Sequence, residues 1–124
     1  MTVSTTNDLR GYSVYKNAPL SVKKTRHVAN LVRGMNVLQA KAQLLHLRQK
    51  AAIHILKCLN SSVANYLAVG GNLDQASVQV VLGKGRVLKR LTYRAKGKAD
   101  RILHKYTHIT VIVTEKSFSG ALAA

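Results

Sequence analysis

Apolar residues recur every three or four positions in three segments of the chain, and this spacing predicts three amphipathic helices. The first helix is predicted from about residue 22 to 33, with Ser21 as its N-cap and Gly34 as its C-terminal stop. A short helix near 37–47 and a longer one near 51–67 follow. The positions predicted to be buried are Thr25, Val28, Ala29 and Val32, then Val37, Ala40, Leu44 and Leu47, then Ala52, Ile55, Leu56, Leu59, Val63 and Leu67.

Polar and apolar residues alternate in three other segments, which is typical of half-buried strands. The first covers residues 11–16 and is followed by Pro19, and the others cover 77–82 and 106–114. The last two are predicted to be antiparallel partners, with these side chains facing inward: Val78, Val80, Leu82, Ile109, Val111 and Val113. The expected fold class is α+β, with three helices packed on a small antiparallel sheet.

The connection between the last two strands, residues 83–105, is strongly basic. It holds nine Lys or Arg residues and one acid, Asp100. A connection of this length in a compact domain is generally functional or disordered, and an isolated two-stranded ribbon is marginal in water. We therefore predict a long protruding β-hairpin arm that binds a polyanion, with its turn near residues 94–97, where Gly97 supplies a permissive backbone. Each leg of about eleven residues would reach roughly 35 Å.

The whole chain has 124 residues and a formal net charge of +16, with no acid between Asp8 and Asp74. A hydrophobic content of 47% excludes a wholly disordered basic tail. The expected organisation is one globular domain over 11–116, with flexible tails at 1–10 and 117–124. Such a charge predicts a polyanionic partner, most simply nucleic acid. No run of eighteen apolar residues suggests a membrane span, and the first residues lack the apolar core of a secretory signal.

The predicted first helix has a basic face that extends this interpretation. Lys23, Arg26, Asn30 and Arg33 fall within one arc, roughly opposite the positions predicted to be buried. An ordinary solvated face is the alternative. Since no acid interrupts the arc, we interpret it as a phosphate-binding face.

Catalytic and metal chemistry are not indicated. His54 and Cys58 have the spacing of a metal-ligand pair, but a structural zinc site needs four ligands and only His46 lies nearby in sequence. We interpret them as a partly exposed histidine and a buried cysteine. The single cysteine excludes an intramolecular disulfide and favours a reducing compartment. Four scattered carboxylates and no phosphate-loop motif argue against an enzyme, and no cofactor is expected.

Two other classes of protein share parts of this pattern. A DNA-compacting protein or an RNA chaperone would explain the charge, but it gives no reason for a long arm flanked by strands. A membrane-active basic domain would also be cationic, but the alternating strands and the core-sized apolar stripe argue against it.

Several short motifs, in order and at matching spacing, carry a resemblance to a known family over about residues 12–115. They are SVKKTRHV at 21–28, LVRG at 31–34, KCLNSSVAN at 57–65, LKR at 88–90, RAKGKADRI at 94–102 and HITVIV at 108–113. Together they resemble the bacterial or organellar form of large-subunit ribosomal protein twenty-two. The chain departs from the family where Lys84, Gly85 and Arg86 replace an acid pair and a Gly-Pro, and where Tyr93 replaces a proline.

The resemblance implies a structural constituent of the large ribosomal subunit. Such a protein binds large-subunit ribosomal RNA, supports assembly and lines the nascent-peptide exit tunnel with its hairpin arm. The implied partners are that RNA, neighbouring large-subunit proteins and the nascent polypeptide, with no membrane and no homo-oligomer. The implied location is the ribosome, in the bacterial cytoplasm or in an organelle (mitochondrial matrix or plastid stroma).

Two sets of site residues follow from the basic patterns and the resemblance together. The expected RNA-binding residues are Lys23, Arg26, Arg33, Lys84, Arg86, Lys89, Arg90, Tyr93, Arg94, Lys96, Lys98, Arg101 and Lys105. The expected tunnel-facing residues are Leu88, Lys89, Arg90, Arg94, Ala95, Lys96 and Gly97. For Tyr93, stacking on a base and simple packing are both open interpretations.

Overall fold

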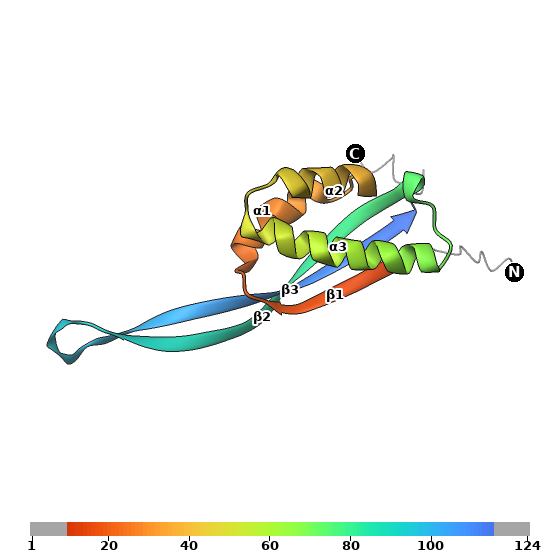
Figure 1. Ribbon diagram of the computed structural model, residues 1–124. Coiled ribbons are helices and arrows are strands. Elements are labelled where there is room, and N and C mark those ends of the chain that lie inside the picture. The colour runs from red at the N-terminus through yellow and green to blue at the C-terminus, as the bar shows by residue number, and fades with distance from the viewer. Residues whose placement is uncertain (1–9, 116–124) are drawn as a thin grey trace, which may run out of the picture.

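A computed structural model describes residues 10–115, which form three helices on one face of a three-stranded antiparallel sheet (Figure 1). The elements are β1 (Arg10–Ala18), α1 (Val22–Val32), α2 (Val37–His46), α3 (Lys50–Ala68), β2 (Ala76–Tyr93) and β3 (Ala99–Glu115). Single 3-10 turns lie at Leu73–Gln75 and Ala95–Gly97. The predicted α+β class is confirmed. Of the predicted tails, 1–10 and 117–124, only Arg10 is among the described residues, where it begins β1. The last residue of the predicted domain, residue 116, also lies outside them.

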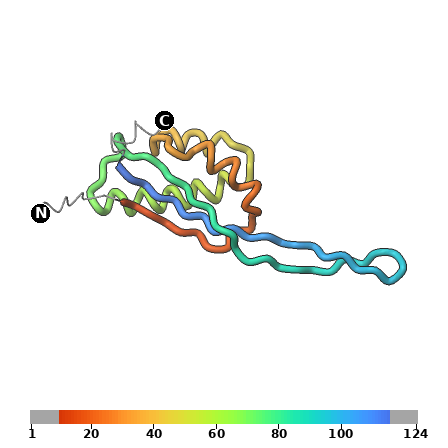
Figure 2. The backbone as a smooth tube through the Cα atoms, turned by 180° about the vertical axis from the view of Figure 1, so that it is seen from behind, coloured from red at the N-terminus to blue at the C-terminus, as the bar shows by residue number. Residues whose placement is uncertain are grey.

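The central strand of the sheet is β3, with β1 on one side and β2 on the other. Val78 pairs with Val113, and Val80 pairs with Val111. Because alternate side chains of a strand point to opposite faces, this register places the inward valines of both strands together under the helices. Figure 2, seen from behind, shows that no helix covers the other face of the sheet among the described residues.

Local capping residues explain where the first two helices begin and end. The Lys24 backbone N–H donates to the Ser21 hydroxyl at 3.5 Å, as the N-cap prediction requires. Asn36 caps α2 in the same way, by accepting from the Leu38 backbone N–H at 3.0 Å. Gly34 follows α1 with φ of 81°, a left-handed conformation that favours glycine. The predicted ends of both helices are therefore correct to within about a residue.

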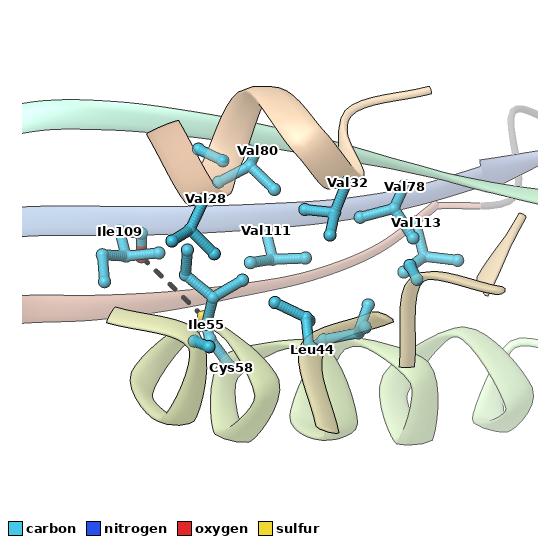
Figure 3. Packing of buried hydrophobic residues seen from close by; sticks show 14 of the residues in the cluster. Val28, Val32, Leu44, Ile55, Cys58, Val78, Val80, Ile109, Val111 and Val113 are labelled. Atoms are coloured by element: carbon cyan, nitrogen blue, oxygen red, sulfur yellow. Dashed lines mark hydrogen bonds between the residues drawn. The ribbon is translucent and has the colours of Figure 1, made fainter. Parts of the chain in front are cut away.

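The core lies between the helices and the covered face of the sheet (Figure 3). Val28 and Ile55, from α1 and α3, are fully buried, as are Ile109, Val111 and Val113 from β3. Burying aliphatic side chains of this size stabilises a fold by about 1.5–3 kcal/mol each. These residues hold the sheet and helices in one arrangement, which fixes where both ends of the basic connection emerge.

One part of the predicted core is wrong. Leu47, Leu56 and Leu82 are partly buried and pack against the core, but Leu67 is 48% exposed, whereas Tyr66 is fully buried. The reason is that α3 lies against β1 at Gly11, where an added Cβ would come within 2.5 Å of the Tyr66 Cβ. Gly71 makes room for the Tyr66 ring in the same way. Burial also raises the pKa of the Tyr66 hydroxyl.

Candidate nucleic-acid interface

Residues 83–105, which we call the distal hairpin, continue β2 and β3 beyond the helices (Figure 1). The two strands stay paired in register from Val87 and Lys105 to Tyr93 and Ala99. No residue of the distal hairpin is buried. Its nine cationic side chains are thus displayed to solvent on a regular ribbon, with little of the protein's own surface to pack against.

A bulge marks the base of the distal hairpin. The register shifts between Lys84 and Val87, so Gly85 and Arg86 lie opposite Tyr106. The backbones approach closely there, since an added Cβ at Gly85 would lie 2.8 Å from the Tyr106 carbonyl oxygen. The Arg86 guanidinium lies 4.9 Å from the centroid of the Tyr106 ring, a cation–π contact. A bulge bends its strand and increases the local twist, so this feature helps to aim the hairpin.

Strand alternation divides the cations of the distal hairpin between two faces. Past the bulge, Val87 and Lys89 of β2 share a face with their partners Lys105 and Leu103 of β3. Arg90, adjacent to Lys89 in sequence, lies on the opposite face together with Leu88. The three neighbours predicted to face the tunnel therefore do not present one common surface.

The tip is a tight turn stabilised by its own backbone. The Arg94 N–H donates to the Lys98 carbonyl oxygen at 2.8 Å, and Lys96 and Gly97 have φ of 58° and 70°. The turn lies where it was predicted, but the need for a left-handed backbone at Lys96 as well as Gly97 was not foreseen. Tyr93 is 93% exposed beside this turn, so its ring is open to solvent.

The predicted basic face of α1 is exposed, with one difference in detail. Lys23, Arg26, Asn30 and Arg33 are all exposed. The Arg33 guanidinium already donates from Nη1 to Asn30 Oδ1 at 3.1 Å and from Nη2 to the Val80 carbonyl oxygen at 2.9 Å. Arg33 therefore links α1 to β2, and only its remaining donors are left for another ligand.

The tertiary structure brings the α1 face to the base of the distal hairpin and not to its tip. A groove of about 820 Å³ is lined by Lys23 and Arg26 of α1 and by Lys84, Lys89 and Lys105 of the hairpin. Five of the predicted RNA-binding residues line this groove and form the basal group: Lys23, Arg26, Lys84, Lys89 and Lys105. Tyr93, Arg94, Lys96 and Lys98 lie at the tip, whereas Arg33, Arg86, Arg90 and Arg101 belong to neither group.

Two cations that the sequence analysis left out also lie at the base. Lys24 and Lys50 line a second groove of about 560 Å³ together with His104 and Lys105. Both lysines stand near the first residues of predicted helices in a stretch without acids, but nothing in their spacing showed that these helix starts meet the hairpin.

The Cys58 thiol is buried and belongs to the core. Its Sγ donates to the Ile109 carbonyl oxygen at 3.8 Å (Figure 3), and the Ser13 hydroxyl donates to the Cys58 carbonyl oxygen at 2.6 Å. Among residues 10–115, no group of three or more His, Cys, Asp or Glu side chains comes together to hold a metal ion. The thiol therefore acts here as a small packing group that ties α3 to the sheet.

His54, one turn before Cys58, packs its ring on Tyr15 of β1, with centroids 5.6 Å apart. Burial lowers the pKa of His54, and the nearby Lys50 and Lys57 lower it further. Both causes favour the neutral imidazole, so His54 adds little to the positive surface near neutral pH.

No helix within the described range, residues 10–115, is long and apolar enough to cross a membrane. Comparison with known protein families yields a match to the family described as Ribosomal protein L22p/L17e, over residues 13–114. The matched range spans most of the sheet, all three helices of the described range and the whole distal hairpin. The grooves and the tip described above all lie inside it.

Proposed function

The chain belongs to the ribosomal protein L22p/L17e family, and from that premise we propose that it binds large-subunit ribosomal RNA, supports assembly of the subunit and lines the nascent-peptide exit tunnel with the distal hairpin. Family membership alone makes it a structural constituent of the large ribosomal subunit, in a family of structural proteins and not of enzymes. The finer roles rest on the residues.

The observation that carries the proposal is the excess of exposed cations on the distal hairpin, in which no residue is buried. Between Gly83 and Lys105 there are nine cations against one acid, and none of these side chains is buried. Cations held on a ribbon repel one another unless anions intervene. Each phosphate that they neutralise releases condensed counterions, which favours binding. A phosphate-rich surface is therefore the partner that this ribbon fits.

Folded RNA suits the ribbon better than an RNA duplex read through its bases. The major groove of A-form RNA is too narrow for side chains, so proteins recognise its shape, its backbone and its unpaired bases. Guanidinium groups such as those of Arg90 and Arg101 bind phosphates in bidentate geometry. In this proposal the basal group binds backbone phosphates, while Tyr93 stacks on an unpaired base at the tip.

The tunnel-lining role is assigned to the tip and the adjacent strand ends. Residues 94–97 are the part of the hairpin farthest from the helices (Figure 2), so they are the part best placed to meet a nascent polypeptide. Neighbouring large-subunit proteins are the other proposed partners. The proposed compartment is the bacterial cytoplasm or an organelle.

A salt titration of RNA binding by the purified chain tests the proposal. With about eight phosphates neutralised, the slope of log K against log salt lies between about −5 and −7. A slope shallower than about −2 contradicts binding through the phosphates.

Competition between duplex DNA and a folded large-subunit RNA fragment tests specificity, because equal affinity for the two favours a DNA-compacting or chaperone protein. Sedimentation with large subunits through a high-salt wash tests incorporation.

A further inference from the structure

The groove between α1 and the base of the distal hairpin combines two kinds of surface. Its cationic side chains are Lys23, Arg26, Lys84, Lys89 and Lys105, and no acid lines it. Between them lie aliphatic side chains, among them Leu82, Val87 and Leu103. Val87 and Leu103 are 42% and 47% exposed, so the groove presents apolar surface to solvent among its cations.

Such a groove fits a ligand that carries both negative charge and a flat apolar body. Phosphate alone would satisfy the cations but leave the aliphatic side chains in water. An RNA duplex would bring phosphates to the rim, but its bases stay stacked inside the helix and do not reach the floor. An unpaired nucleotide supplies both parts, because its base is free to leave the stack while its flanking phosphates remain outside.

We propose that this groove binds an unpaired nucleotide of RNA, with the base on Val87 and Leu103 and the flanking phosphates on the surrounding cations. The proposal rests on the RNA-binding function proposed above and assigns it a distinct subsite, away from the tip. Lys89 and Lys105 belong to both the groove and the hairpin, so a strand bound along the hairpin leads directly into the groove.

The first turn of α1 adds to the same subsite. Ser21, Val22 and Lys23 line the groove, and the amino end of a helix carries partial positive charge from its aligned peptide dipoles. A phosphate beside Lys23 therefore meets both a side-chain charge and the helix end. An acidic peptide would meet the same charges, but it has no planar apolar group joined to each anion.

The sequence offers a matched pair of substitutions. Leu103 and Ile102 are neighbours in β3 with similar exposure, 47% and 44%, but they lie on opposite faces and only Leu103 lines the groove. Leu103→Thr removes apolar surface from the groove, and Ile102→Thr removes a similar amount elsewhere. Threonine keeps strand propensity in both variants, and thermal unfolding followed by circular dichroism verifies their folding.

Fluorescence anisotropy with the full chain measures binding to two RNAs of about ten nucleotides, one single-stranded and one duplex. We expect Leu103→Thr to weaken single-stranded binding roughly fivefold and duplex binding by less than about twofold. Ile102→Thr should change either by less than about twofold. Equal losses on both RNAs, or equal effects of the two substitutions, would overturn the proposal.

Crosslinking gives a second measurement that does not depend on a variant. A single-stranded RNA with one photoreactive 4-thiouridine should crosslink to the peptides that contain Val87 or Leu103. Crosslinks confined to the tip overturn the groove assignment. Oligoglutamate serves as a competitor for RNA. If it displaces RNA from the unsubstituted protein but not from Leu103→Thr, the groove binds acidic peptide through Leu103, and the proposal is overturned in favour of a protein ligand. If these tests fail while the salt slope and the RNA preference hold, the proposed function stands without this subsite.

Discussion

Arg94 Nε lies 2.5 Å from Asp100 Oδ2, so the only acid of the distal hairpin is paired with a cation at the tip. The two side chains are 65% and 58% exposed. An exposed pair of this kind contributes about 0–1 kcal/mol to stability. Its main consequence is electrostatic, because it removes one charge from the set that phosphates would otherwise meet.

Substituting Asp100→Asn should therefore strengthen RNA binding without changing the fold. The change frees the Arg94 guanidinium and raises the net charge by one. The salt dependence of binding should become steeper by about 0.7–0.9 in log–log slope, the contribution of one additional phosphate. A filter-binding titration measures the slope, and urea unfolding should show a change below about 1 kcal/mol. An unchanged slope would show that Arg94 does not reach phosphate.

Removing the Tyr93 ring tests base stacking at the tip. Tyr93 is 93% exposed, so Tyr93→Ala should leave the stability of the free protein nearly unchanged. If the ring stacks on a base, affinity for large-subunit RNA falls by about 1–3 kcal/mol. Leu91→Ala, at a position that is 72% exposed on the same hairpin, is the matched control. Tyr93→Phe should bind normally. A Tyr93→Ala effect no larger than that of Leu91→Ala contradicts stacking.

Charge reversal on the hairpin should impair binding more than the same reversal on the body. Lys89→Glu places an acid in the basal group, whereas Lys57→Glu makes the same change in net charge on an exposed position of α3. We expect the first variant to lose about tenfold or more in RNA affinity and to incorporate poorly into large subunits. The second should lose much less. Equal losses would mean that net charge, and not the hairpin, decides binding.

Adding a methyl group at the bulge should disturb the base of the hairpin. In Gly85→Ala the new Cβ would lie 2.8 Å from the Tyr106 carbonyl oxygen, so the backbone must shift. We expect a loss of about 1–3 kcal/mol in the free energy of unfolding, as for other overpacked sites. Gly83→Ala is the control, because its Cβ would make ordinary contact with His108 at 3.6 Å. Similar urea midpoints for the two variants would argue against a close approach at Gly85.

His54 should make the protein less stable in mild acid. Because the pKa of His54 is lowered in the folded state, the unfolded chain binds this proton more tightly. The stabilisation is therefore present above the unfolded pKa, about 6.5, and is lost as the pH falls through the folded value. His54→Gln should reduce the acid loss, and Lys57→Gln should reduce it by a smaller part. Urea unfolding at pH about 7.5 and about 5 measures both. An acid loss in His54→Gln as large as in the unsubstituted protein would contradict the assignment.

Periodicity predicted the elements well, because burial of one face is what creates a periodic pattern. The alternation of Val and Ile around 109–113 indicates a strand with one covered face, and the spacing of Val28 and Val32 indicates a helix with one covered face. The inward residues Ile109, Val111, Val113, Val28 and Val32 are all buried. The pattern failed at Leu67 and Tyr66, two adjacent residues that differ by one helical step. Hydrophobicity favoured Leu67, but the space beside Gly11 selected Tyr66.

The sequence by itself determined the α+β class, the family, the N-cap at Ser21 and a basic connection too polar to form a core. These are local properties, readable from spacing and composition. Only the tertiary structure decided that α1 meets the base of the hairpin, that Arg33 is partly occupied by Val80 and that Lys24 and Lys50 join the basal cations. Contacts between residues far apart in the chain depend on strand register and helix packing, and no spacing within one segment encodes them.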